Sequence, residues 1–515
     1  MNPDKRREII FLFLLVLIGF VLRFYTFDQR SLWVDEIHTF NDSRDDLKGQ
    51  INFYKETPTY LHPPLFFVLT HLFHPFTSPE RDLRILPLMF GTLSIPMIYL
   101  VSGLFSPLIA LPCTFSLTFM TYHISLSQDG RSYSFLMFIG MASLFFFLRY
   151  LKTLKKRFLI PVAVLYAILF HTSYSSIPFI LFSQLLWFYR RDAESKKPDV
   201  SAFFLLSGLT LLFCLPWILF IILHYRGEPV MDPFHTESPG SLGSMVYSLF
   251  HDWVPRFPLM VVSALLLVLL PFFSKPKKNA LVLLAVFILP VGGLFLFCTL
   301  FDLAHFVTSR YFINFLPFFF ISIYLSLDGI EIKFQGLKGF LRLKLLFLIL
   351  LIATNVVILP LYYRSEKQDF RTLVTFLKEQ LRGGDKVFVE DVSSMVGILH
   401  YFKQYPQNRH YKVSTLNDRA GEIVLVKPFV YQNRPFVLLS SKACCAQYRE
   451  DGTRLWLIVG KNTAKKMKED SPSVLKGYFD GTFLNYNKFP LDASMYLFLW
   501  DPQSPEEKRI DLSIE

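Results

Sequence analysis

Cysteine is scarce in this chain, with five residues among 515. Cys113, Cys214 and Cys298 lie in apolar runs and are predicted to be core residues. Cys444 and Cys445 are adjacent, and a disulfide between sequence neighbours is sterically awkward. No Cys or His spacing resembles a zinc site. The cysteines therefore indicate no functional site.

The sequence also lacks internal repeats, low-complexity tracts and, after residue 362, any apolar run long enough to cross a membrane. Hydrophobic residues nevertheless make up 52% of the whole chain, which contains 57 Phe and has a mean hydropathy of +0.38. This apolar content exceeds that of a soluble globular protein. The sequence predicts a polytopic α-helical membrane domain over 1–362, followed by a soluble α/β domain over 363–515.

The formal net charge of +12 does not indicate a nucleic-acid partner. Lys and Arg collect in five short clusters between apolar runs and not on one amphipathic face. The positive-inside rule assigns all five clusters to the cytoplasm. They are Lys5, Arg6 and Arg7; Arg149, Lys152, Lys155, Lys156 and Arg157; Arg190, Arg191, Lys196 and Lys197; Lys275, Lys277 and Lys278; and Lys333, Lys338, Arg342 and Lys344. The loop around Asp35, the loops at 225–258 and 301–310, and the C-terminal domain then face outward.

Twelve apolar runs are candidate spans. They lie at about 9–27, 61–77, 85–103, 105–124, 132–149, 158–172, 175–190, 201–224, 259–274, 280–300, 311–327 and 345–362. A cytoplasmic N-terminus and an outward C-terminal domain require an odd number of crossings. One of the runs between 61 and 124 is therefore expected to fall short, which leaves about eleven crossings. The first run is too long for a cleavable signal peptide and lacks a small-residue cleavage site, so it is expected to stay attached.

The C-terminal domain alternates charged residues with short β-prone runs. Apolar residues at helical spacing predict a helix over 368–381, which Gly383 and Gly384 end, and a second helix is predicted over 392–403. The predicted strands lie at 386–390, 422–427, 435–440, 454–460 and 495–500.

The acidic pair Asp35 and Glu36 closely follows the first apolar run, at a membrane surface. A carboxylate there can take a proton from an acceptor hydroxyl, and cations can hold a leaving phosphate. Arg131 and Arg310 are candidate phosphate holders, because Arg binds phosphate bidentately. Each of these charges also has a plainer interpretation, since solvated carboxylates fill loops and Arg beside Tyr commonly anchors a span at the interface.

His62 lies in a His-Pro-Pro sequence at the mouth of the next apolar segment. This pattern is typical of a helix start, because proline is favoured in the first turn of a helix. A histidine there can also bind substrate or help to hold a metal. The many aromatic residues of the spans suit packing and lipid contact, and would accommodate a polyprenyl chain.

Four motifs occur in order along the membrane portion. They are Leu32-Trp33-Val34-Asp35-Glu36, His62-Pro63-Pro64-Leu65-Phe66, Gln128-Asp129-Gly130-Arg131-Ser132-Tyr133-Ser134, and Arg310-Tyr311 with Pro317. In these motifs the chain resembles the GT-C glycosyltransferases of family 39 and the related protein-O-mannosyltransferase and aminoarabinose-transferase type. Asp129-Gly130 stands where the relatives more often have Glu-Ala, and Phe66 where Tyr is usual.

The resemblance implies a cell-envelope glycosyltransferase that moves a hexose or pentose from a polyprenyl-phosphate donor to an acceptor hydroxyl on the outer side of the cytoplasmic membrane. Asp35 is the expected base and Glu36 a supporting or metal-ligating carboxylate, both in a first outward loop over 28–60. The expected substrate-binding residues are His62, Asp129, Arg131, Tyr133, Arg310 and Tyr311.

Two other classes of protein stay open. One is a transporter or flippase of lipid-linked glycans, which normally carries ionisable residues inside its spans. The other is a non-catalytic envelope-assembly protein. Charge concentrated in loops favours the enzyme, whose partners would be the donor, membrane lipids and a lipid, glycan or protein acceptor, without nucleic acid. No cofactor is required by the sequence, and a divalent metal would be compatible with the carboxylates although no clear ligand set demands one.

Overall fold

The structure is a computed structural model that describes most of the chain. The described residues are 3–58, 60, 62–189, 200–226, 241–273, 277–300, 309–333, 343–406, 411–412, 414–417, 423–440, 452–470, 473–482 and 492–503. Cys444 and Cys445, the basic cluster between 190 and 197, and residues 301–308 of the predicted outward loop 301–310 lie outside the described residues.

The chain divides into two compact units. The first comprises Met1–Phe27, Asp46–His74 and Arg81–Leu361. The second comprises Asp28–Asp45, Pro75–Glu80 and Tyr362–Glu515. The segment that carries Asp35 and Glu36 therefore belongs to the same unit as the C-terminal part of the chain.

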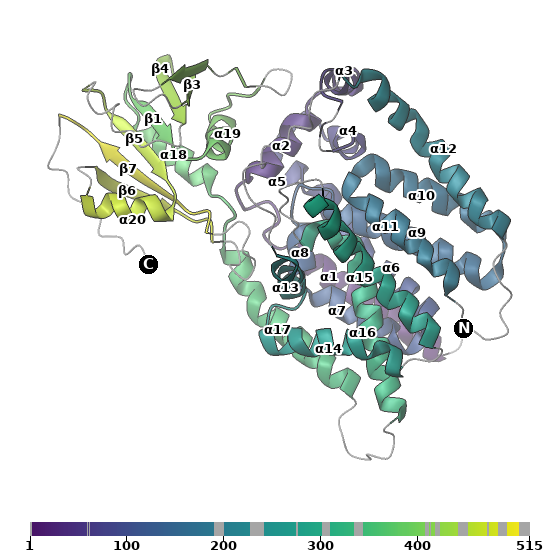
Figure 1. Cartoon of the computed structure of the whole chain (residues 1–515). Coiled ribbons are helices and arrows are strands. Elements are labelled where there is room, and N and C mark those ends of the chain that lie inside the picture. Colours follow the sequence, from purple (N-terminus) through teal and green to yellow (C-terminus); the bar gives the residue numbers. More distant parts are fainter. Residues whose placement is uncertain are drawn as a thin grey trace. The chain divides into compact units, whose positions relative to one another are not determined.

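The first unit is helical (Figure 1). Its longer helices are α1 (Pro3–Phe24), α6 (Ile85–Phe105), α7 (Pro107–Phe119), α9 (Tyr133–Thr153), α10 (Leu159–Thr172), α12 (Val200–His224), α13 (Leu242–Trp253), α14 (Phe257–Phe273), α15 (Lys277–Leu300), α16 (Leu316–Lys333) and α17 (Leu343–Arg364). Its shorter helices are α3 (Leu47–Glu56), α4 (Leu65–His71), α8 (Thr121–Ser127), α11 (Ile177–Phe182) and the 3₁₀ helices η1 (Lys156–Phe158), η2 (Tyr174–Ser176), η3 (Ser183–Phe188) and η4 (Ser309–Phe315). Helix α5 (Pro79–Asp82) includes residues of both units, as does the end of α17.

The chain is an integral membrane protein, as predicted. Among the described residues, six helices are long and apolar enough to cross a membrane, or up to eight if each of two bent helix pairs is one span. The predicted run at 61–77 forms only the seven residues of α4, about a third of the roughly 30 Å hydrocarbon core. This is a run between 61 and 124 that falls short, as expected. The run at 158–172 forms a 14-residue helix and the run at 175–190 is divided between α11 and η3, so length and composition alone do not reach eleven crossings.

The break between α7 and α8, which are bent by 62°, has internal partners for its backbone. Arg23, fully buried at the end of α1, donates to the carbonyls of Leu117 at 3.0 Å and Thr118 at 3.2 Å. The side-chain oxygen of Asn355 accepts from the Thr121 N–H at 2.8 Å. Because lipid offers no hydrogen bonds, these contacts allow the helix to break inside the unit.

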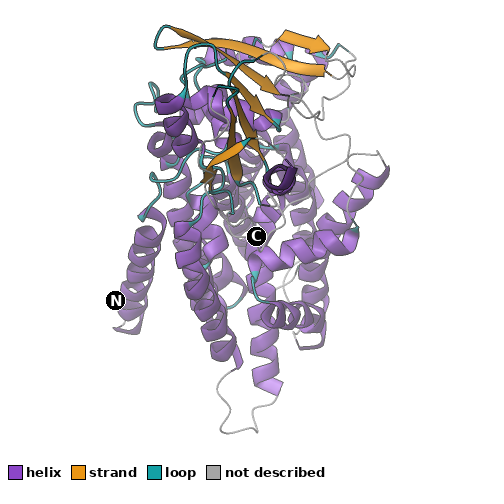
Figure 2. Cartoon of the chain, turned by 90° about the vertical axis from the view of Figure 1, so that its left-hand side faces the viewer, coloured by secondary structure: helices purple, strands orange, loops and turns teal. Residues whose placement is uncertain are grey.

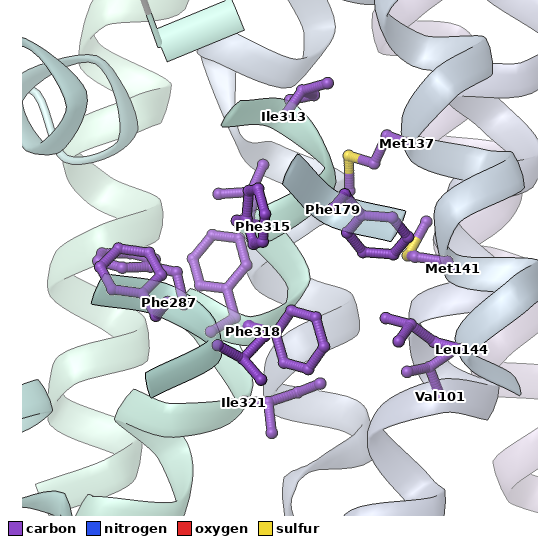
Figure 3. Packing of buried hydrophobic residues seen from close by; sticks show 14 of the residues in the cluster. Val101, Met137, Met141, Leu144, Phe179, Phe287, Ile313, Phe315, Phe318 and Ile321 are labelled. Atoms are coloured by element: carbon purple, nitrogen blue, oxygen red, sulfur yellow. The ribbon is translucent and has the colours of Figure 1, made fainter. Parts of the chain in front are cut away.

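Aromatic, methionine and aliphatic side chains together fill the core of the first unit (Figure 3). Met137 and Met141 of α9 lie beside Phe179. The ring of Phe179 meets that of Phe315 with centroids 5.7 Å apart. Phe318 of α16 continues the cluster. Helix α9 therefore packs against the segment that contains η4 and α16.

The second unit contains a seven-stranded sheet (Figure 2). Its strands are β1 (Lys386–Val389), β2 (Ser414–Asn417), β3 (Ile423–Tyr431), β4 (Arg434–Ser440), β5 (Leu455–Val459), β6 (Val474–Phe479) and β7 (Met495–Trp500), in the order β2-β3-β4-β1-β5-β7-β6. Strand β1 pairs in parallel with β4 and β5, and the outer pairs are antiparallel. The helices of this unit are α2 (Val34–Ser43), α18 (Phe370–Gln380), α19 (Val392–Tyr401) and α20 (Lys461–Asp470).

Both faces of this sheet are covered, because successive side chains of a strand point to opposite faces. Leu455 and Leu457 of β5 share a buried cluster with Met467 of α20. Trp456, between them, meets Phe376 of α18, with ring centroids 6.4 Å apart. The predicted α/β character is confirmed, and each predicted helix and strand of this domain has its counterpart. Strands β2 and β6 and helix α20 were not predicted.

Candidate active site

The two predicted catalytic carboxylates lie in the first turn of α2. Trp33 precedes the helix in an extended conformation, and its N–H donates a long hydrogen bond of 3.4 Å to Oε2 of Glu36. The side chain of Glu36 is only 1% exposed, whereas Asp35 is half-buried. Carboxylates are favourable at this position because a helix N-terminus carries partial positive charge. Glu36 therefore supports the helix start, and Asp35 is the more accessible carboxylate.

His62 and Arg131 are in direct contact within the first unit. Nη2 of Arg131 lies 3.1 Å from Nε2 of His62. Because a guanidinium can only donate, Nε2 accepts, and the neutral imidazole carries its proton on Nδ1. The carbonyl of His62 accepts from the Tyr54 hydroxyl at 2.5 Å. Helix α4 begins just after His62-Pro63-Pro64, so this sequence starts a helix and also orients an arginine.

The motif around Arg131 sits in a buried turn between α8 and α9. Gln128 and Asp129 are 3% and 2% exposed. The side-chain amide of Gln128 donates to the carbonyls of Arg23 at 2.7 Å and Tyr25 at 2.6 Å, which ties the turn to the end of α1. The Arg131 N–H donates to the carbonyl of Asp129 at 2.6 Å. The turn presents Arg131 from a fixed backbone.

Arg310 and Tyr311 belong to η4, and Arg310 lies near the aromatic residue that opens α9. The guanidinium carbon of Arg310 is 5.7 Å from the ring centroid of Tyr133 and 5.7 Å from that of Tyr311. Both distances fall within the range of cation–π attraction. Two motifs that are far apart in the sequence therefore meet in the first unit.

The structure thus brings the predicted residues into three groups. His62 contacts Arg131, and Arg310 lies over Tyr133 and Tyr311. Asp35 and Glu36 share the first turn of α2 in the second unit. Asp129 is buried in the turn that precedes Arg131 and supplies a backbone carbonyl there. The assignment of all these residues to one site stays a prediction.

The fold of this chain is similar to that of solved structures. ArnT from Cupriavidus metallidurans in the apo state matches with a TM-score of 0.52 and 11% sequence identity, over 98% of this chain and 100% of that chain. The chain has a GT-C fold. The resemblance inferred from the four motifs is confirmed at the level of fold.

Two further structures are similar at lower scores. ArnT from Cupriavidus metallidurans bound to undecaprenyl phosphate has a TM-score of 0.49 at 11% identity, over 97% of this chain and 99% of that chain. An Archaeoglobus fulgidus oligosaccharyltransferase tethered with an acceptor peptide has a TM-score of 0.47 at 12% identity, over 77% of this chain and 63% of that chain. No family model and no curated protein matches the sequence. At such identities a shared fold does not establish a shared substrate.

One buried chain of hydrogen bonds beside Arg310 was not predicted from the sequence. Ser309 donates to Oδ2 of Asp252, and the hydroxyl of Tyr122 lies 2.7 Å from the Ser309 hydroxyl. Because Ser309 donates to the carboxylate, Tyr122 donates to Ser309. Asp252 is 1% exposed at the end of α13. The sequence predicts an outward loop over 225–258, and the amphipathic pattern of α13 is the signal in that loop that points to this carboxylate.

No divalent-metal site is evident in the described part of the chain. Among those residues, no group of three or more His, Cys, Asp and Glu side chains is placed to hold a metal ion. Asp35 and Glu36 alone do not make the oxygen-rich cage that a divalent metal prefers.

Proposed function

We propose that this chain is a membrane glycosyltransferase that transfers a sugar from a polyprenyl-phosphate donor to an acceptor hydroxyl. The observation that carries the proposal is the pair of oriented arginines in the first unit. His62 accepts from the guanidinium of Arg131, and Arg310 lies over Tyr133. Guanidinium groups held in this way suit a phosphate group, which they bind through parallel N–H donors.

In the proposed reaction, Asp35 takes the proton of the acceptor hydroxyl as its oxygen attacks the anomeric carbon of the sugar. The bond between that carbon and the phosphate oxygen breaks, and polyprenyl phosphate leaves with the electron pair. Arg131 and Arg310 stabilise the negative charge that develops on the leaving phosphate. Glu36 supports the start of the helix that carries Asp35. Tyr133 and Tyr311 belong to the proposed substrate site through their rings beside Arg310. His62 and Asp129 belong to it through their contacts with Arg131.

The membrane in which the chain lies and its orientation there are also proposals. The basic clusters support an N-terminus in the cytoplasm and a C-terminal domain outside the cytoplasmic membrane. In that orientation the segment 28–60 is the first outward loop, and a lipid, glycan or protein acceptor would be reached from the outer side. The proposed sugar is a hexose or a pentose. Arg131 and Arg310 would contact the phosphate of the donor and would therefore accept either sugar.

The test compares cells that express the wild-type chain, Asp35→Asn or no chain. Mass spectrometry of envelope lipids and glycans identifies a sugar that only the wild type adds. Purified protein is then given undecaprenyl-phosphate-linked hexoses and pentoses with the acceptor so identified, and release of undecaprenyl phosphate is measured. Asp35→Asn should lower turnover by about 10² to 10⁴, because it removes the general base and keeps the size of the side chain.

The matched control is Asp28→Asn, an exposed residue of the same segment, which should leave turnover within about twofold of the wild type. Full activity in Asp35→Asn would overturn the assignment of the base. Loss in Glu36→Gln alone would move that role by one residue. A wild-type chain that alters no envelope glycan and releases no undecaprenyl phosphate would refute the enzyme itself.

A further inference from the structure

The extended segment before Asp35 is held by the C-terminal part of the second unit. The Leu32 N–H donates to the hydroxyl of Tyr401 at 2.8 Å, and the Val34 N–H donates to Oε1 of Gln368 at 3.0 Å. The side chain of Arg371 donates to the carbonyl of Arg30 at 2.9 Å. A segment outside regular secondary structure needs partners for its buried peptide groups. These three partners fix the path of the backbone into α2.

The hydroxyl of Tyr401 is the centre of this arrangement. It accepts from the Leu32 N–H and from the Ser31 hydroxyl, the latter at 3.2 Å, and donates to Oε1 of Glu80 at 2.9 Å. One hydroxyl has one proton and two lone pairs, so its full capacity is used. Burial, reinforced by the nearby Glu80 carboxylate, raises the pKa of Tyr401 above its ordinary value, so the hydroxyl keeps the proton that it donates.

Glu80 and Arg371 complete the arrangement. Nη2 of Arg371 lies 3.1 Å from the same Glu80 oxygen that accepts from Tyr401. The N–H of Arg371 donates to the Ser31 hydroxyl at 3.2 Å. We call Ser31, Leu32, Glu80, Arg371 and Tyr401 the Tyr401 cluster. It joins three stretches that are distant in sequence, around residues 31, 80 and 371–401, within one unit.

The other half of α2 rests on the same part of the unit. The ring of Phe40 meets His400 edge-on at 4.8 Å and lies 5.3 Å from Tyr405. The guanidinium carbon of Arg44 lies 4.4 Å from the ring centroid of Tyr405. Helix α2 is therefore held at its start by hydrogen bonds and near its end by ring packing, with α19 taking part in both.

We infer that Tyr401, assisted by Arg371 and Gln368, is a positioning residue for the carboxylate of Asp35. The C-terminal domain then positions Asp35, the proposed base. It does not act as a separate binding module. This inference rests on the proposed function. Its physical basis is that a reacting group displaced by about 1 Å can lose about 10² in rate.

The decisive variant is Tyr401→Phe, which removes the three hydrogen bonds of the hydroxyl and keeps the ring. We expect kcat to fall by about 10-fold to 100-fold, with KM for the undecaprenyl-phosphate sugar changed by less than about twofold. In the Asp35→Asn background, Tyr401→Phe should cost nothing further, since it acts through Asp35. Hydrogen exchange of the full chain in detergent should accelerate in peptides that cover residues 30–36.

The matched control is Tyr478→Phe in β6 of the same unit. Its hydroxyl lies 3.1 Å from that of Ser494 and 3.3 Å from a carboxylate oxygen of Asp480, outside the Tyr401 cluster. Kinetics and exchange of residues 30–36 should match the wild type. If Tyr401→Phe does not fold, Gln368→Met removes only the acceptor of the Val34 N–H, and should lower kcat by about threefold to tenfold with the same local gain in exchange.

Unchanged kcat in a folded Tyr401→Phe would overturn the inference, as would an equal loss of kcat in Tyr478→Phe. Unchanged exchange of residues 30–36 in Tyr401→Phe would also overturn it, whatever the activity. If the wild type itself releases no undecaprenyl phosphate, the proposed function fails separately. The exchange measurement then still decides whether Tyr401 holds the segment.

Discussion

Helices α9 and α12 satisfy the same sequence criteria for a membrane span and occupy different environments within the first unit. In its most apolar 18-residue stretch, 72% of α9 is buried, against 11% of α12. Helix α12 is the more hydrophobic of the two. Because lipid tails are as apolar as a protein core, high hydropathy indicates contact with lipid as readily as burial in the protein.

Burial distinguishes the inner helix α9, whose serine side chains are fully enclosed. Ser134 of α9 donates to the carbonyl of Pro87 at 2.9 Å, and Ser143 to that of Gly140 at 2.7 Å. Large side chains of α12 stay exposed, including Phe204 and Leu223. The predicted substrate-binding residue Tyr133 opens α9. None of the predicted site residues lies on the outer helix α12.

The largest difference is expected between substitutions of the arginines that flank the two helices. Arg131→Lys, just before α9, should lower turnover by about 10², because an ammonium cannot make the paired N–H contacts of a guanidinium to phosphate and loses the fixed contact with His62. Arg226→Lys is the same substitution at an exposed position two residues after α12. It should leave turnover within about twofold of the wild type. The measurement is release of undecaprenyl phosphate by equal amounts of folded protein. Equal losses in both variants would remove Arg131 from the site.

A smaller effect is expected when a methyl group is added to each helix. A Cβ at Gly140 of α9 would lie 2.7 Å from Oδ1 of Asn314, whereas nothing lies within 4 Å of a Cβ at Gly208 of α12. Gly140→Ala should therefore destabilise the protein by about 1 to 3 kcal/mol through overpacking. Gly208→Ala should stabilise it by about 0.5 to 1 kcal/mol, because Ala loses less backbone entropy in a helix. Thermal unfolding in detergent measures both, and a stable Gly140→Ala would show that α9 is not tightly packed there.

Sequence patterns predicted the class of the protein and most elements of its C-terminal domain, because long apolar runs and alternating strands leave strong local signals. They missed α20, whose sequence is mostly charged and polar, and β6, which contains Gly477. Both are fixed by tertiary packing, as in the cluster that Met467 shares with Leu457. Helix α4 was expected to belong to a longer run, and its short length could not be derived from hydropathy.

The candidate site shows the same limit. The sequence selected His62 and Arg131 separately, but their contact joins residues that are 69 positions apart in the chain. Tyr401 carried no local signal at all, because its role depends on partners 321 to 370 residues away. Motifs identify the chemistry of a side chain, while the contacts that orient it come from the fold.

The smallest expected effect tests the buried chain beside Arg310. Tyr122→Phe removes the hydrogen bond to Ser309, the residue that precedes Arg310, and leaves Ser309 paired with Asp252. A hydrogen bond of this kind contributes about 1 kcal/mol, so turnover should fall by about threefold to tenfold if Ser309 orients Arg310.

The matched control for Tyr122→Phe is Tyr174→Phe, whose hydroxyl accepts from the indole N–H of Trp217 in α12 at 3.0 Å. It loses a bond of the same kind at the outer helix, so thermal stability should fall slightly and turnover should not change. The two variants are compared in the same transfer assay. Each is assayed at the same interval below its own unfolding temperature. If Tyr174→Phe slows transfer as much as Tyr122→Phe does, the inner and outer helices contribute alike, and the buried chain does not act through Arg310.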